Sequence, residues 1–280
     1  MASQRWWSKD TVAVVTGGNK GIGFEIVRQL AKKGISVVLT ARDEKRGLAA
    51  QAKLKSENLH VEFRELDVSS SDSVAGLASW LEKEYKGFDI LVNNAAVVGN
   101  EFSFQAVKNL VDTNYDGVKR TTRVLSPLLR PSQAGARIVN ISSQLGQLHR
   151  LGIESYKKKL TDIENLSSEV IDSFVDDYLS AVRDGKVEAS GWPRGIFGAY
   201  TVSKIALNAY TRLVARDVQR EGRQLYVNCV HPGYVKTDLN NNRGFLSTEQ
   251  GADTAVWLAL VPANEQSSGD FFYERKKYEF

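Results

Sequence analysis

Short apolar runs alternate with helical patterns along most of the chain, and this alternation limits the possible folds most strongly. The run at 11–16 (TVAVVT) is typical of a buried strand, and residues 21–34 after it have apolar side chains at a helical period. Further strands are expected at 35–41, 60–66, 89–95, 136–142 and 224–230. Strands separated by helices pair in parallel, so the sequence predicts an α/β fold with a doubly wound parallel sheet and helices on both faces. No linker interrupts the pattern, so residues 1–280 are expected to form a single domain.

The composition argues against several other classes of protein. The chain has 280 residues, 42% of them hydrophobic, and a net charge of +4, and its basic residues form no clustered face, so no nucleic-acid partner is expected. It has no apolar run of the roughly 20 residues that a membrane helix needs, and its first residues do not resemble a secretory signal. The lone cysteine, Cys229, and three scattered histidines offer no metal-ligand pattern. We therefore expect a cytoplasmic protein with no metal and no membrane contact.

One block departs from the alternation of strands and helices. Residues 160–187 have apolar side chains at spacings of three and four, which predicts a helix, and Thr161 and Glu164 have the spacing of a capping box. We interpret residues 146–196 as a helical insertion that precedes the helix containing Tyr200.

The glycine-rich sequence TGGNKGIG (16–23) lies between the first predicted strand and the first predicted helix. Glycines at such a junction let the backbone approach a pyrophosphate, and the helix N-terminus presents free N–H groups and a positive dipole. A glycine pattern alone is weak evidence, but this position between strand and helix strengthens it. The sequence therefore predicts a dinucleotide-binding loop formed by Gly17, Asn19, Lys20, Gly21, Ile22 and Gly23.

The end of the second predicted strand (LTARD) bears on the choice between NAD and NADP. An NAD site usually has an acidic residue there to bind the ribose 2′-hydroxyl, but this chain has Ala41 followed by Arg42. Arg42 and Lys20 would suit a 2′-phosphate, which arginine can bind through two hydrogen bonds. Asp43 is interpreted as the N-cap of the next helix. The predicted cofactor is NADPH/NADP+, and a plain surface role is the alternative for Arg42.

Six motifs occur in the order found in the short-chain dehydrogenase/reductase family. They are T-G-x-x-x-G-x-G at 16–23, NNA at 93–95, Asn114 in TNYDG, NISS at 140–143, Tyr-x-x-x-Lys at 200–204 and HPGYVKTDL at 231–239. The chain resembles this family over its whole length and is most similar to the monomeric carbonyl reductase branch, especially its plant menthone/neomenthol and salutaridine reductase-like members. The resemblance implies a Rossmann-type sheet and a monomeric enzyme, whose insertion would cover the helices that commonly form dimer faces in the family.

The resemblance also implies the catalytic residues, namely Tyr200, Lys204, Ser143 and Asn114. Tyr200 would donate a proton, Ser143 would bind the substrate oxygen, and Asn114 would complete a proton relay to Lys204, which also binds the nicotinamide ribose. The residue types agree, because a lysine one helical turn from a tyrosine favours tyrosinate and lowers its pKa. The implied reaction is NADPH-dependent reduction of a small ketone or aldehyde to the alcohol, with hydride from the nicotinamide. The alternatives are an idle NADP-binding sensor or interaction module and, for the serine, Ser142.

Tyr156 competes with Tyr200 for the role of proton donor. It lies 13 positions after Ser143, about the distance found in family members without the insertion, but the residue four positions on is Leu160 and not lysine. Only a spacing of three or four brings two side chains together on a helix. Tyr200 is therefore the predicted donor, and Tyr156 is interpreted as a surface or insertion residue.

The resemblance implies further contacts around these residues. Two cofactor contacts would flank the adenine, one follows the fourth strand, and two would touch the nicotinamide carboxamide. These are, in that order, Asp67 and Val68, Asn94, and Val235 with Thr237. Gln144, Tyr234 and Trp192 would line the substrate pocket, and a packing role is the alternative for Trp192.

Overall fold

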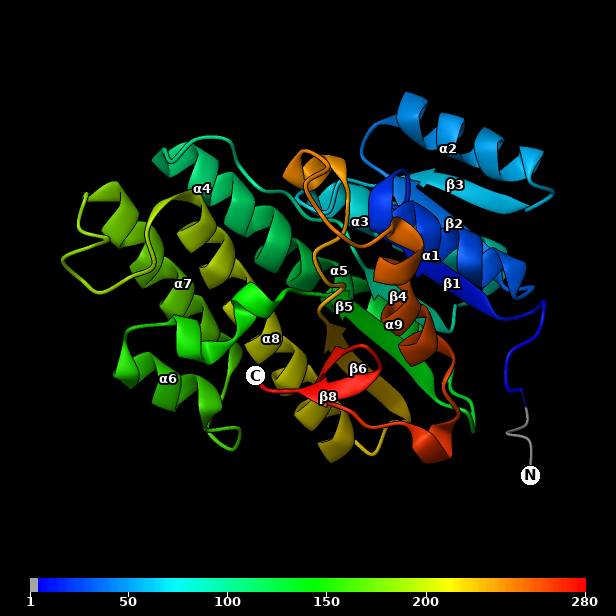
Figure 1. Cartoon of the computed structure of the whole chain (residues 1–280). Helices are drawn as coiled ribbons and strands as arrows, with labels where there is room; N and C mark the ends of the chain where they lie inside the picture. The colour runs from blue at the N-terminus through cyan, green and yellow to red at the C-terminus, as the bar shows by residue number, and fades with distance from the viewer. Residues whose placement is uncertain (1–4) are drawn as a thin grey trace.

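The computed structural model describes residues 5–280, and eight strands within this range form one sheet (Figure 1). The strands are β1 (Val12–Val15), β2 (Ser36–Ala41), β3 (Val61–Glu65), β4 (Ile90–Asn93), β5 (Ala136–Ile141), β6 (Leu225–Val230), β7 (Phe271–Tyr273) and β8 (Lys276–Tyr278). Their order is β3-β2-β1-β4-β5-β6-β7-β8, and every neighbouring pair is parallel except β7 and β8. The predicted α/β class with a doubly wound parallel sheet is confirmed.

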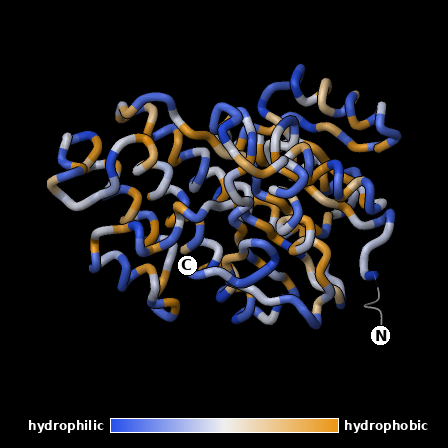
Figure 2. The backbone as a smooth tube through the Cα atoms, in the orientation of Figure 1, coloured by the Kyte–Doolittle hydropathy of each residue, from blue (hydrophilic) through white to orange (hydrophobic). Residues whose placement is uncertain are grey.

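The central strands are apolar on both faces because helices cover both. In β1, Ala13 and Val15 point into one core, whereas Val12 and Val14 point into the other, as the period of two along a strand requires. Helices α1, α2 and α9 pack on the first face, and α3, α5 and α8 pack on the second. Figure 2 shows the hydrophobic residues concentrated along the strands inside these layers.

Nine α-helices lie within residues 5–280. They are α1 (Gly21–Lys32), α2 (Glu44–Ser56), α3 (Ser71–Tyr85), α4 (Phe104–Val111), α5 (Gly117–Leu125), α6 (Glu154–Thr161), α7 (Ser168–Arg183), α8 (Gly195–Arg220) and α9 (Thr248–Leu260). A π-helical turn, Asp112–Asp116, joins α4 to α5. Short 3-10 turns occupy Ser126–Leu128, Gln144–Gly146, Leu148–Arg150, Asp238–Asn240 and Ala263–Glu265.

The two strands that the sequence did not predict are β7 and β8. Each has three residues, which is too short for a period of two to be recognised. β7 joins the sheet by pairing Phe271 with Cys229 of β6, and β8 folds back on β7 as an exposed edge strand.

The prediction of a single helix over 160–187 is wrong about where that helix begins. α6 ends at Thr161 and α7 begins at Ser168, so the predicted capping box at Thr161 is not formed. The chain turns between them because the Asn165 amide donates to the Asp162 carboxylate over 2.8 Å. The true N-cap of α7 is Ser167, whose hydroxyl accepts from the backbone N–H of Val170.

Residues 146–196, called here the 146–196 segment, pack beside the sheet and not on it. In Figure 1, α7 lies on the same side of the molecule as α4 and α8, and its buried side chains share one apolar core with those two helices. Phe174, Tyr178 and Ile171 are fully buried in that core. The segment therefore adds a third layer over α4 and α8.

Candidate active site

The predicted site residues gather at the carboxyl ends of the parallel strands. Gly17 follows β1, Asn94 follows β4, Ser143 follows β5 and Thr237 follows β6. The chain runs from β1 outward through β2 to β3 and then returns to place β4 on the other side of β1. A crevice forms outside the sheet where the strand order reverses in this way, and ligands of open α/β sheets bind there.

The glycine loop has the shape that a pyrophosphate needs. Gly17 and Gly21 have φ values of +63° and +57°, and a Cβ on Gly17 would lie 2.9 Å from the Ala95 Cα. The N-cap of α1 is Lys20, and no described side chain caps this helix. Its first N–H groups are thus available to an anion, so these residues fit a dinucleotide phosphate. Asn19 and Ile22 lie in the same loop and first turn, both partly buried.

Asn94 ties the loop after β4 to the glycine loop. Its amide donates to the carbonyls of Thr16 and Gly17, each over 3.0 Å. Thr16 completes the link, because its hydroxyl accepts from the backbone N–H groups of Asn94 and Ala95 over 2.9 and 3.0 Å. Thr16 was not among the predicted site residues, although the threonine of the T-G-x-x-x-G-x-G pattern was the signal for it.

The two predicted cations near the adenosine end differ in their surroundings. Arg42 is exposed directly after β2, and Asp43 caps α2 by accepting from the Arg46 backbone N–H over 2.8 Å, as the sequence predicted. Lys20, however, forms an exposed ion pair of 3.1 Å with Asp238. The Lys20 ammonium is thus engaged by a carboxylate, whereas Arg42 forms no ion pair within residues 5–280.

Tyr200 and Lys204 lie one turn apart on α8, as their spacing requires. The Lys204 ammonium lies 5.5 Å from the centroid of the Tyr200 ring and donates to the Ile141 carbonyl at the end of β5 over 2.8 Å. Ser143 is two residues beyond Ile141 and forms a side-chain hydrogen bond with Tyr200. Tyr200, Lys204 and Ser143 are thus brought together at one point of the crevice.

Burial has the largest effect on the pKa values of Tyr200 and Lys204. It raises the pKa of Tyr200 to about 12, against the opposing effect of the hydrogen bond with Ser143, and lowers the pKa of Lys204 to about 7. The pKa of Tyr200 therefore lies above its ordinary value and not below it as expected, because the burial of the phenol is the largest effect on it. Tyr200 is protonated at neutral pH, which is the form that can donate a proton.

Ser142 and Ser143, which follow β5, differ in their burial and in their partners. Ser142 is buried, and its hydroxyl donates to the Asn208 carboxamide oxygen over 2.5 Å. Ser143 is only partly buried and faces Tyr200. Asn208 also donates to the Gly146 carbonyl over 3.0 Å, so it supports the chain on both sides of Ser143. Asn208 was not predicted, although its position four residues after Lys204 places it on the same helix face.

Asn114 lies at the centre of the π-helical turn between α4 and α5 and is fully buried. Its side chain pairs with both backbone groups of Val97, accepting over 2.8 Å and donating over 2.9 Å. Its amide also donates to the Ser203 hydroxyl over 3.3 Å, beside Lys204. π-helical turns of this kind are frequent at functional sites.

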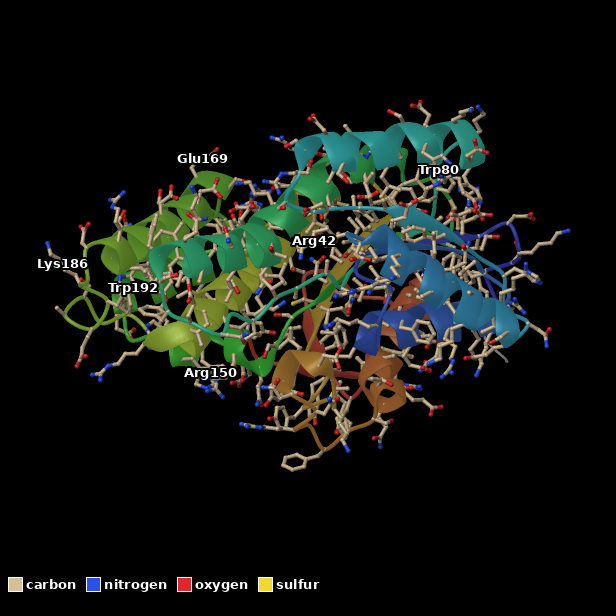
Figure 3. The ribbon with its side chains drawn as sticks, turned by 90° about the horizontal axis from the view of Figure 1, so that it is seen from above. Arg42, Trp80, Arg150, Glu169, Lys186 and Trp192 are labelled. Atoms are coloured by element: carbon tan, nitrogen blue, oxygen red, sulfur yellow. The ribbon has the colours of Figure 1, made fainter. Side chains whose placement is uncertain are left out.

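Two aromatic residues of the 146–196 segment, Trp192 and Tyr156, lie apart from Tyr200, Lys204 and Ser143. Trp192 is 6% exposed and packs against Tyr156, Phe174 and Tyr178, with ring centroids 5.3–5.5 Å away. Figure 3 shows it among the helices of the segment and away from Arg42. These contacts favour the packing alternative for Trp192. Tyr156 lies on α6, where its hydroxyl donates to Asp177 of α7, so this bond stays within the 146–196 segment.

The remaining predicted contacts follow β3, β5 and β6 along the chain. Asp67 accepts from the backbone and hydroxyl of Ser69 over 2.9 and 2.6 Å just after β3. Val68 and Val235 are buried, and Thr237 lies against Gly21 of the glycine loop. Gln144 and Tyr234 are exposed, after β5 and β6 respectively.

Within residues 5–280, no three His, Cys, Asp or Glu side chains lie close enough together to hold a metal ion. No helix in the same range combines the length and the apolar character needed to cross a membrane.

The comparisons with known proteins agree with this geometry. The family model described as short chain dehydrogenase matches residues 11–158 and 187–245 and leaves unmatched only part of the 146–196 segment between them. (+)-Neomenthol dehydrogenase of Arabidopsis thaliana is 40% identical, over 96% of this chain and 97% of that protein. Carbonyl reductase (NADPH) 1 of Mus musculus is 36% identical, over 97% of this chain and 99% of that protein.

The solved structure of salutaridine reductase from Papaver somniferum superimposes with a TM-score of 0.87 at 38% identity, and covers 94% of this chain and 99% of that one. Sequence and structure thus lead to the same relatives. From the family model, these relatives and the shared fold, we conclude that this chain belongs to the short-chain dehydrogenase/reductase family and is an oxidoreductase.

Proposed function

We propose that this enzyme reduces a ketone or aldehyde to the alcohol with NADPH. The observation that carries the proposal is the meeting of Tyr200, Lys204 and Ser143 at the crevice, with Tyr200 in its protonated form. A carbonyl that accepts hydride develops negative charge on its oxygen, and a protonated tyrosine beside that oxygen supplies what the product needs. The names of the relatives, which include a carbonyl reductase specified for NADPH, support the same reaction.

The cofactor is NADP(H), which supplies the hydride when it is bound. The first turn of α1 and the glycine loop would hold the pyrophosphate, and Arg42 would bind the 2′-phosphate. Asn94 would keep the wall of this site in place through its bonds to Thr16 and Gly17.

Side chains of the protein bind the substrate oxygen and transfer the proton. Ser143 donates a hydrogen bond to the substrate oxygen, and Tyr200 transfers its hydroxyl proton to that oxygen. Lys204, whose pKa is lowered to about 7 by burial, can regain a proton near neutral pH and then stabilise the charge left on Tyr200. Asn114 holds the inner end of a relay through water, along which a replacement proton reaches Lys204 from solvent.

The proposal is tested by the loss of absorbance at 340 nm when NADPH is mixed with a panel of cyclic ketones, quinones and aldehydes. Wild type should turn over at least one of them, and Tyr200→Phe should lower kcat by about 10²- to 10⁴-fold. Binding of NADPH, followed by its fluorescence, should persist in the variant. Tight NADPH binding without turnover of any carbonyl would instead support the idle sensor.

We also propose that the enzyme is a monomer and that the 146–196 segment is an insertion within one domain. The packing of α7 over α4 and α8 supports this, because it buries surfaces of both helices within the chain itself. Sedimentation at increasing protein concentration should give a single species of 31.1 kDa. A stable dimer would refute the monomer.

A further inference from the structure

Asp172 connects the 146–196 segment to the turn that carries Asn114. Its carboxylate, on α7, accepts from the Tyr115 hydroxyl over 2.8 Å. Both of its oxygens also accept from the Lys119 ammonium over 2.6 Å. One carboxylate of the segment therefore binds one residue of the π-helical turn, Tyr115, and one residue of α5, Lys119.

Both partners of Asp172 are placed to fix that turn. Tyr115 is the residue after Asn114 inside the π-helical turn, and Lys119 is one helical turn further on, in α5. Tyr115 is fully buried with its ring edge against Tyr210 of α8, at a centroid distance of 6.2 Å. A buried hydroxyl without a partner is costly, so the bond to Asp172 favours this one position of the tyrosine.

A continuous set of contacts leads from this turn to the proton donor. Asn114 holds Val97 by two hydrogen bonds and donates to the Ser203 hydroxyl over 3.3 Å. The Ser203 hydroxyl in turn donates to the Tyr200 carbonyl over 2.8 Å. A π-helical turn contains an extra residue relative to an α-helix, so its geometry depends on the side chains that pin it.

We infer that Asp172 is a positioning residue for the reaction: from α7 it fixes the turn that presents Asn114 and so maintains proton transfer at Tyr200. The inference rests on the proposed function. It gives the 146–196 segment a part in catalysis in addition to covering α4 and α8. Asp172 itself touches neither Tyr200 nor Lys204 in the recorded contacts of residues 5–280.

The chain offers a matched control on the same helix. Asp177 of α7 also accepts a tyrosine hydroxyl, that of Tyr156, but both residues belong to the 146–196 segment. Asp172→Ala and Asp177→Ala each remove one carboxylate that binds a tyrosine. Only the first removes a contact with the turn that carries Asn114.

The experiment compares these variants in the full-length enzyme with NADPH and the best carbonyl substrate of the panel. Asp172→Ala should lower kcat by about 10- to 100-fold, the effect of a small misplacement in the site, with the KM for NADPH unchanged. Its solvent deuterium isotope effect on kcat should exceed that of wild type, because proton transfer becomes slower. Asp172→Asn, which can still accept from Tyr115, should fall between Asp172→Ala and wild type, and Asp177→Ala should match wild type.

Tyr115→Phe covers the case in which Asp172→Ala fails to fold. It keeps the ring against Tyr210 and removes only the donor to Asp172, so it should lower kcat and raise the isotope effect in the same direction. If kcat falls equally in Asp172→Ala and Asp177→Ala, or is unchanged in both Asp172→Ala and Tyr115→Phe, the inference about Asp172 is overturned. The proposed function would still stand. Absence of turnover in wild type would refute the proposed function and this inference with it.

Discussion

A Cβ atom on Gly23 would lie 2.2 Å from the Asn94 amide nitrogen and 2.4 Å from the Gly17 carbonyl oxygen. Gly23 is in the first turn of α1, and Asn94 follows β4, so the absence of a side chain lets helix and loop meet. The contact brings the glycine loop and the Asn94 loop together at the edge of the sheet where we propose that the cofactor binds.

Gly23→Ala should therefore weaken cofactor binding. The added methyl group must displace the Asn94 amide and its bonds to Thr16 and Gly17, and we expect NADPH to bind at least about tenfold more weakly, or about 1.4 kcal/mol. Fluorescence titration with NADPH measures this. Gly76→Ala in α3 is the control, because nothing lies within 4 Å of its Cβ position. It should bind NADPH normally and gain roughly 0.5–1 kcal/mol of stability; equal affinities of both variants for NADPH would contradict the assigned role of Gly23.

The two serines at the end of β5 should give opposite results on substitution. Ser143→Ala removes the hydroxyl that faces Tyr200, so kcat should fall by about 10²- to 10³-fold, as on the loss of one oxyanion donor. Ser142→Ala leaves the buried Asn208 oxygen without its donor, so it should cost about 1–3 kcal/mol of stability. Steady-state kinetics and urea unfolding distinguish them, and an inactive but fully stable Ser142→Ala would reverse the assignment.

Arg42→Asp should change the cofactor preference. Charged hydrogen bonds to the 2′-phosphate contribute about 1.5–3 kcal/mol, so NADPH affinity should fall by about 10- to 100-fold, while the new carboxylate can accept from the NADH ribose. The control is Lys45→Asp, which makes the same change of charge at an exposed residue of α2. Dissociation constants for both cofactors provide the measurement, and an unchanged NADPH preference in Arg42→Asp would leave Arg42 as a surface residue.

His231 should make the fold sensitive to acid. Its ring stacks on Tyr273 at 4.9 Å, its Nδ1 accepts from the Gly233 N–H, and burial lowers its pKa from 6.5 to about 4. The folded protein thus binds this proton less readily than the unfolded chain, and stability is lost as pH falls from about 6.5 toward 4, by at most about 3 kcal/mol.

Urea unfolding of wild type and His231→Phe between pH 4 and pH 7 tests this. The phenyl ring keeps the stacking on Tyr273 and cannot take up a proton. As pH falls, the free energy of unfolding should therefore decrease less for the variant than for wild type. Parallel pH profiles for the two proteins would show that His231 titrates normally.

Several features follow from the sequence because they depend on neighbours in the chain. The alternation of strands and helices predicts the sheet, and the glycine pattern between β1 and α1 predicts the phosphate loop. The spacing of Tyr200 and Lys204 places them together on any helix, whatever the length of the 146–196 segment before them. The cytoplasmic location stays a prediction.

Only the tertiary structure decides the relations between distant segments. It pairs Ser142 with Asn208 and so directs Ser143 to Tyr200, it buries Trp192 among Tyr156, Phe174 and Tyr178, and it joins Asp172 to Tyr115. It also reverses the expected pKa of Tyr200, because desolvation depends on what surrounds a group after folding and not on its spacing in the chain. Local spacing determined which residues could act, and packing determined their partners and charges.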